Sequence, residues 1–153
     1  MDLWLAKDAP ERFRQGTNDH ELDELTLKIL ESAFSYLGTP YRYGGTTPGG
    51  FDCSGFVRHV FSENGISLGR SSRDQALDGK RISLYDLKPG DLLFFNMRRR
   101  KQPHIDHVGL YIGKGQFIHA SSSHSREIKI EDLDTDRYLP RIVEARRVLD
   151  NIQ

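Results

Sequence analysis

A single cysteine, Cys53, stands where a glycine-rich stretch gives way to an apolar pattern with helical spacing. Asp52 precedes it, and Ser54 and Gly55 follow it. A thiol at the first turn of a helix suits nucleophilic catalysis, because the helix N-terminus and a neighbouring imidazolium both favour the reactive thiolate. Free backbone N–H groups at a helix start can also stabilise an oxyanion. The pattern therefore indicates a nucleophile, with a buried structural thiol as the alternative.

Two histidines follow in segments that read as strands of one hairpin, His107 before Val-Gly-Leu-Tyr-Ile-Gly and His119 in Gln-Phe-Ile-His-Ala. If a three-residue loop pairs Ile112 with Gln116, both imidazoles lie diagonally on one face of the sheet. A two-residue turn would need a β-bulge to give the same result. We expect His107 to act as general base and His119 to orient it. Each histidine taken alone also fits a hydrogen-bonded core residue.

A catalytic metal is the main chemical alternative, since Cys53, His107 and His119 together could hold a zinc ion with an open position. Such sites usually place two ligands closer in the sequence than the twelve residues that separate these histidines. The sequence therefore predicts no metal and no cofactor. His104 is a rival base, but it belongs to a polar segment that we expect to form a loop.

Helical periodicity dominates the first half of the chain, after a polar N-terminal extension that we place at residues 1–20. Gly38 and Pro40 end the first helix, and Tyr41 lies in the glycine-rich loop that follows. Tyr41 either anchors this loop or reaches into the site from twelve residues before Cys53. The expected helices are 21–37, 53–64 and a short one, with a capping-box start, from about 71 to 78.

The periodicity then changes to short runs of β-branched and aromatic residues, which are typical of strands. Helices followed by closely spaced antiparallel strands make an α+β domain, with helices packed on a sheet of about five to six strands. We place this single domain at residues 21–153. The expected strands are Leu92–Phe95, Val108–Ile112, Gln116–Ala120, Ile128–Ile130 and Ile142–Val148.

Composition excludes several classes of function. The 22 basic and 22 acidic side chains cancel, so the chain has no global charge that would attract nucleic acid or an anionic membrane. The basic run Arg98–Lys101 is a local exception, which usually forms a solvated loop. No apolar run is long enough for a transmembrane segment, and no secretory signal is visible. We expect a monomer.

Six motifs, in this order along the chain, resemble the NlpC family of papain-like cell-wall cysteine peptidases, and within it the murein endopeptidases of the Spr type. The resemblance covers about residues 33 to 149. Six ordered motifs make it specific. The motifs are Thr39–Gly45, Phe51–Val57, Arg70–Ser72, Leu87–Leu92, His107–Gly113 and Phe117–Ala120.

The resemblance implies a papain-like α+β fold that hydrolyses amide bonds in peptidoglycan stem peptides or cross-links, in the bacterial cell envelope. It implies a Cys-His-His triad of Cys53, His107 and His119, without a cofactor. It assigns Tyr41 to the oxyanion or substrate site, and Asp52 and Ser54 to positions that hold the amino end of the substrate in some relatives. The motif with Arg70 and Ser71 is expected to border the same site.

Two departures from the family pattern border the expected cleft. Leu68-Gly69-Arg70 replaces the usual Leu-Pro-Arg, and the segment from Phe95 to Asp106 is longer and more basic. Both bear on the substrate more than on the chemistry. Two other functions remain open from sequence: an acyltransferase or amidase that uses the same triad on another substrate, and a non-catalytic cell-wall-binding module.

Overall fold

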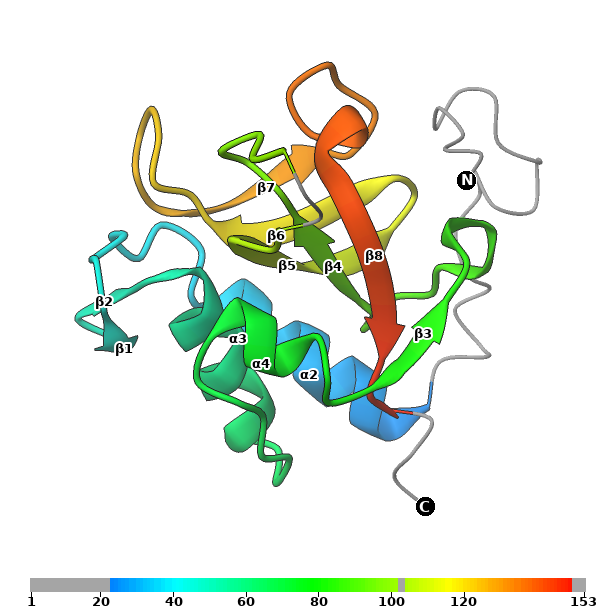
Figure 1. Cartoon of the computed structure of the whole chain (residues 1–153). Helices are drawn as coiled ribbons and strands as arrows, with labels where there is room; N and C mark the ends of the chain where they lie inside the picture. The colour runs from blue at the N-terminus through cyan, green and yellow to red at the C-terminus, as the bar shows by residue number, and fades with distance from the viewer. Residues whose placement is uncertain (1–22, 102–103, 150–153) are drawn as a thin grey trace.

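A computed structural model describes residues 23–101 and 104–149, which form an α+β domain (Figure 1). Helices precede most of the strands, as predicted, and pack against one side of an antiparallel sheet. The proposed extension at residues 1–20 lies outside the described residues. The main elements are α2 (Glu24–Ser35), β1 (Thr46–Thr47), β2 (Gly50–Phe51), α3 (Cys53–Ser62), α4 (Ser72–Gln75), β3 (Lys80–Ile82), β4 (Leu92–Phe95), β5 (His107–Gly113), β6 (Gln116–Ala120), β7 (Ile128–Asp132) and β8 (Ile142–Arg147). Two short 3₁₀ helices, Leu84–Asp86 and Leu139–Arg141, precede β4 and β8.

Aspartates cap both of the longer helices. The carboxylate of Asp23 accepts a backbone N–H at 2.7 Å before α2, and that of Asp52 accepts one at 2.6 Å before α3. α2 ends at Ser35, two residues earlier than predicted. The chain then turns at Gly38, whose φ of +86° is a left-handed conformation that glycine adopts without steric cost. α3 ends at Ser62, two residues earlier than predicted. These caps fix where Cys53 enters its helix.

The main sheet has six strands in the order β3-β8-β4-β5-β6-β7, and all neighbours are antiparallel. The five predicted strands are confirmed, although β7 continues two residues beyond Ile130 to Asp132. β3 and the small sheet of β1 and β2 were not predicted. Each has only two or three residues, which is too short for a periodic pattern.

The β5–β6 hairpin differs from the prediction at its turn. Leu110 pairs with Ile118, but the pairing then shifts so that Gly113 faces Gln116. The two residues between them have positive φ values of 54° and 77°, as a tight hairpin turn requires. The expected three-residue loop was therefore wrong, and a two-residue turn with a bulge forms instead. The register of the strand bodies is as predicted, so both histidines lie on the same face.

The sheet is covered on both faces. One face packs against α2 and α3, with Phe56 and Val60 of α3 fully buried among sheet residues. The other face carries an aromatic cluster around Phe95, Phe117 and Tyr138, closed by the chain between β7 and β8. Each fully buried side chain of this size stabilises the fold by about 1.5–3 kcal/mol. The two histidines contact the aromatic cluster.

Close backbone packing holds the loop after α2 against the first turn of α3. The N–H of Asp52 donates to the carbonyl oxygen of Gly45 at 3.0 Å. A Cβ atom at Gly55 would lie 2.1 Å from the same oxygen, which is far inside van der Waals contact. Glycine at position 55 therefore permits the approach that places Tyr41 and Cys53 in neighbouring segments.

We expect Gly55→Ala to lower the free energy of unfolding by about 1–3 kcal/mol, because neither backbone can move without disturbing the other. Gly49→Ala is the matched control, since its nearest new contact is the Thr47 hydroxyl at 3.6 Å. Urea unfolding curves of both variants would measure the difference. Equal midpoints would contradict the steric role of Gly55.

Candidate active site

Cys53 is the first residue of α3, as the sequence predicts, and its side chain is partly exposed. Cys53 packs against the core cluster that includes Val108 of β5. Because Val108 directly follows His107, this packing brings the start of the helix to the start of the histidine-bearing strand. The backbone N–H groups of Val108, Ser54 and Cys53 act to lower the pKa of the thiol, as donors that favour negative charge do.

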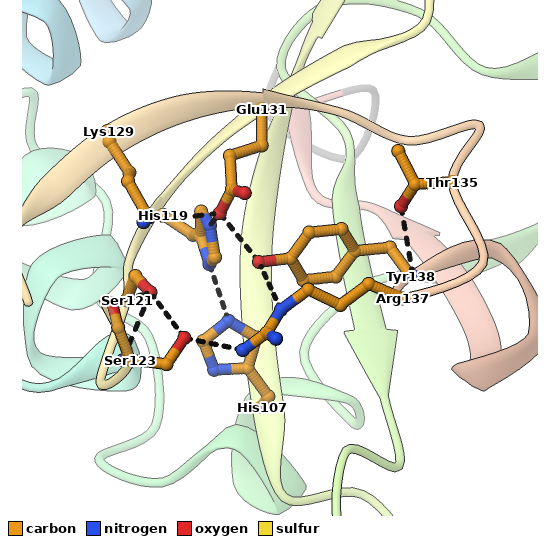
Figure 2. A network of polar contacts seen from close by, with 9 residues as sticks. All are labelled: His107, His119, Ser121, Ser123, Lys129, Glu131, Thr135, Arg137 and Tyr138. Atoms are coloured by element: carbon orange, nitrogen blue, oxygen red, sulfur yellow. Dashed lines mark hydrogen bonds and ion pairs between the residues drawn. The ribbon is translucent and has the colours of Figure 1, made fainter. Parts of the chain in front are cut away.

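His107 and His119 meet as the strand register predicts. Nε2 of His107 lies 2.8 Å from Nδ1 of His119, and the two rings are nearly perpendicular at 81° (Figure 2). Since Nε2 of His107 is used in this hydrogen bond, Nδ1 is the ring nitrogen left to accept a proton. His119 is buried, with 2% of its surface exposed, so its orientation is set by protein contacts.

Behind His119 lie two residues that the sequence did not reveal. Nε2 of His119 is 2.6 Å from Oε2 of Glu131, and the hydroxyl of Tyr138 donates to the same oxygen at 2.6 Å (Figure 2). The strand predicted at Ile128–Ile130, which corresponds to β7, ended one residue too early to include Glu131. Only the pairing of β6 with β7, which places Glu131 opposite Phe117 and so diagonal to His119, reveals the contact.

Burial opposes charge throughout this network. Burial, and then the charge of His119, lower the pKa of His107 well below its usual value. Burial also lowers the pKa of His119, although the hydrogen bond to Glu131 opposes this. Burial acts to raise the pKa of Glu131, but hydrogen bonds from His119 and Tyr138 outweigh it and bring that pKa to about 2. The ionised state therefore belongs to Glu131, and both imidazoles are neutral at neutral pH.

The expected lowering of the Cys53 pKa does not occur in the free protein. Burial raises this pKa to about 11, and the neighbouring Asp52 carboxylate adds to the increase, although the Val108 N–H opposes it. The N-terminal field of α3 is partly cancelled because the helix is capped by an ionisable aspartate. The thiol and both imidazoles are thus neutral in the resting protein.

Tyr41 and Cys53 both pack against the core cluster on the helix side of the sheet. Burial raises the pKa of Tyr41, and the charge of Cys53 is the next cause. The N–H of Tyr41 donates to the carbonyl of Arg126 at 2.8 Å, and the Arg126 guanidinium lies 5.9 Å from the centre of the Tyr41 ring. A protonated phenol in this place offers a donor for an oxyanion.

Asp52, Ser54 and Arg70 form one hydrogen-bonded group. The two terminal nitrogens of Arg70 donate to Oδ2 of Asp52 at 2.8 Å and to the hydroxyl of Ser54 at 2.9 Å. Gln75, which the sequence did not indicate, donates to the carbonyl of Ser54 at 3.0 Å. Ser71 accepts a backbone N–H at 3.1 Å as the cap of α4, so its contact here is that of a helix cap.

Both segments that depart from the family pattern form local hydrogen bonds. The N–H of Gly69, which a proline would lack, donates to a carboxylate oxygen of Asp78 at 2.7 Å. In the longer segment, the Asp106 carboxylate accepts the N–H groups of Met97 and Arg98 at 2.8 and 3.0 Å. His104, the rival base, contacts the guanidinium of an exposed arginine at 3.1 Å and does not join the histidine pair.

Among residues 23–101 and 104–149, no three His, Cys, Asp or Glu side chains are grouped so that they could hold a metal ion. In the same part of the chain, no helix has both the length and the apolar character needed to cross a membrane.

The sequence profile of the NlpC/P60 family matches residues 38–147. The chain belongs to the NlpC/P60 family. This confirms the resemblance found in the sequence, and the matched range begins before Tyr41 and includes both histidines.

Comparisons with individual proteins agree with this family membership. The chain is 40% identical over 127 residues to murein DD-endopeptidase MepS/murein LD-carboxypeptidase of Escherichia coli (strain K12), covering 82% of this chain and 64% of that protein. It is 41% identical over 119 residues to γ-D-glutamyl-L-lysine dipeptidyl-peptidase of Bacillus subtilis (strain 168), covering 78% of this chain and 40% of that protein. A crystal structure of an NlpC/P60 family protein from Bacillus cereus superposes with a TM-score of 0.75 at 35% identity, covering 81% of this chain and 40% of that one. The chain thus spans less than two thirds of each.

We expect the alkylation of Cys53 by iodoacetamide to accelerate about tenfold per pH unit from pH 6 to 9, because a raised pKa keeps the reactive thiolate scarce below about 11. Cys53 is the only cysteine, so mass spectrometry of the intact protein reports this thiol alone. A rate that levels off below pH 7 would instead indicate a preformed thiolate–imidazolium pair.

Proposed function

We propose that this chain is a cysteine endopeptidase domain that hydrolyses amide bonds in peptidoglycan stem peptides or cross-links. The observation that carries the proposal is the histidine pair joined at 2.8 Å, on a strand that packs against the helix whose first residue is Cys53. Membership of the NlpC/P60 family and the name of the Escherichia coli relative support this substrate class. We accordingly propose the bacterial cell envelope as the site of action.

In the first half of the reaction, Nδ1 of His107 takes the proton from the Cys53 thiol as the sulfur attacks the amide carbonyl carbon. Negative charge moves to the carbonyl oxygen, where the Cys53 N–H and the Tyr41 hydroxyl stabilise it. The carbon–nitrogen bond then breaks, and the leaving amine takes the proton from His107. An acyl-thioester on Cys53 remains.

In the second half, His107 removes a proton from water, and the resulting hydroxide attacks the thioester carbon. The carbon–sulfur bond breaks, and the sulfur recovers its proton from His107. The product leaves as a carboxylic acid and releases its own proton to solvent. Proton transfer during attack, in place of a preformed ion pair, agrees with the burial that disfavours both charged partners in the free protein.

The group of Asp52, Ser54 and Arg70 is proposed to line the substrate site, with Ser71 supporting the segment that carries Arg70. Asp52 already caps α3 and pairs with Arg70 at 2.8 Å, so a substrate ammonium would have to compete with a guanidinium for this carboxylate. A carboxylate neutralised in this way suits a peptide without a free amino end. This supports action on longer stem peptides or cross-links.

We expect Cys53→Ala and Cys53→Ser to lose hydrolysis by at least about 10³-fold while keeping the fold, because each removes the nucleophile and little packing. Purified peptidoglycan would be digested with each variant and with the parent protein, and the released fragments identified by mass. Thermal unfolding midpoints serve as the folding control. Turnover by Cys53→Ala close to that of the parent would rule out the nucleophile assignment.

The two histidines should differ in their response to glutamine. His119→Gln retains a carbonyl oxygen that can accept the hydrogen bond from His107, so we expect a loss of about 10- to 100-fold. His119→Ala should lose more, and His107→Gln, without a base, should lose at least about 10³-fold. Rates on one defined stem peptide would test this order, and equal losses for both glutamine variants would contradict the division of roles.

A further inference from the structure

We propose that Glu131, held by Tyr138, whose hydroxyl accepts a hydrogen bond from Arg137, is a positioning residue. It sets the tautomers of both histidines and thereby leaves the His107 Nδ1 lone pair free for the thiol. The inference rests on the proposed function in one respect, which is the role of Cys53 as nucleophile. The hydrogen-bond directions themselves follow from the contacts of the network in Figure 2.

Arg137 fixes the direction of the hydrogen bonds at one end of this network. A guanidinium has N–H donors and no acceptor. Its Nε donates to the hydroxyl oxygen of Tyr138 at 3.2 Å, and one terminal nitrogen donates to the hydroxyl of Ser123. The Tyr138 proton therefore cannot point toward Arg137. It points to Oε2 of Glu131 at 2.6 Å.

Glu131 passes this direction on to His119. An ionised carboxylate accepts hydrogen bonds and donates none, and hydrogen bonds from His119 and Tyr138 hold the pKa of Glu131 at about 2 against burial. Nε2 of His119, at 2.6 Å, must therefore carry the proton. A neutral imidazole has one N–H, so Nδ1 of His119 presents a lone pair.

The tautomer of His107 follows. The 2.8 Å contact between the rings needs one proton, and His119 has none to give at Nδ1. Nε2 of His107 therefore carries the proton and Nδ1 carries the lone pair. If the hydrogen bonds of this network ran in the opposite direction, Nδ1 of His107 would carry the proton and could not accept one from the thiol. Glu131 is the residue that distinguishes the two directions.

The surroundings limit competition from water. His119 and Tyr138 each expose 2% of their surface, and the His119 ring lies 4.6 Å from Phe117 and 5.5 Å from Tyr138, measured between ring centres. The other charged groups nearby are Arg137 and Lys129, whose Nζ is 4.0 Å from Oε2 of Glu131. Glu131 thus provides the negative charge that favours the His107 imidazolium when it forms.

The test is Glu131→Gln, an amide of the same shape that can donate as well as accept and so no longer dictates the direction. Asp132→Asn is the matched control, because it makes the same charge change at the next residue of β7, in an exposed side chain paired with Gln116 at 3.1 Å. Long-range ¹H–¹⁵N spectra of histidine-labelled protein report each tautomer without substrate, and the two histidine-to-glutamine variants assign the signals.

We expect Nε2-protonated His107 and His119 in the parent and in Asp132→Asn, and loss of this uniform pattern in Glu131→Gln. The kcat of Glu131→Gln should fall about 10- to 100-fold with little change in KM. Its acid limb should move to lower pH, because loss of the negative charge lowers the pKa of the base. A residue that only stabilised the fold would lower activity without moving this limb.

Nδ1-protonated His107 in the parent, or unchanged tautomers in a folded Glu131→Gln variant, would overturn the inference. If Glu131→Gln does not fold, Tyr138→Phe keeps the ring packing and removes one donor to Glu131, and it should weaken the same pattern. Failure of the parent to digest peptidoglycan would remove the proposed function alone, since the tautomers are measured without substrate.

Discussion

The first turn of α3 lies between backbone groups from two distant segments, and the geometry of the site depends on this packing. On one side, the carbonyl oxygen of Gly45 comes so close to Gly55 that no side chain fits there. On the other, Cys53 packs against the core cluster that includes Val108 of β5. Because Val108 follows His107, this packing brings the loop, the helix and the histidine-bearing strand together. The electrostatic cost is that burial disfavours charge on both reacting partners.

Most of the fold could be predicted because its elements carry strong local signals. Apolar periodicity indicated both long helices, Gly38 and Pro40 indicated the end of the first, and β-branched runs indicated five strands. The short strands β1, β2 and β3 could not be predicted, since pairing with a partner strand defines them and two or three residues carry no period. The β5–β6 turn shows the same limit: the register followed from the face that must be buried, whereas the bulge depends on backbone twist.

Some residues of the site could likewise be predicted from the sequence, and others could not. Cys53, Tyr41 and the two histidines could be proposed from the sequence because they are chemically distinctive residues in ordered motifs, and the structure joins His107 to His119. Glu131 was missed, since its role arises only from its diagonal position across a strand pair. Asp52 could be singled out from the sequence as a site residue. Its two simultaneous contacts, as the cap of α3 and as the ion-pair partner of Arg70, could be seen only in the structure.

The segment before Arg70 is held by the hydrogen bond from the Gly69 N–H to Asp78, at the position where the family pattern has proline. Proline would restrict this segment in the unfolded chain as well, whereas glycine leaves the unfolded chain free, and the folded order then depends on the Asp78 carboxylate. Asp78 is exposed and lies outside the group that surrounds Arg70. A substitution at the exposed Asp78 could therefore change the order of the segment before Arg70 without altering any member of the hydrogen-bonded group of Asp52, Ser54 and Arg70.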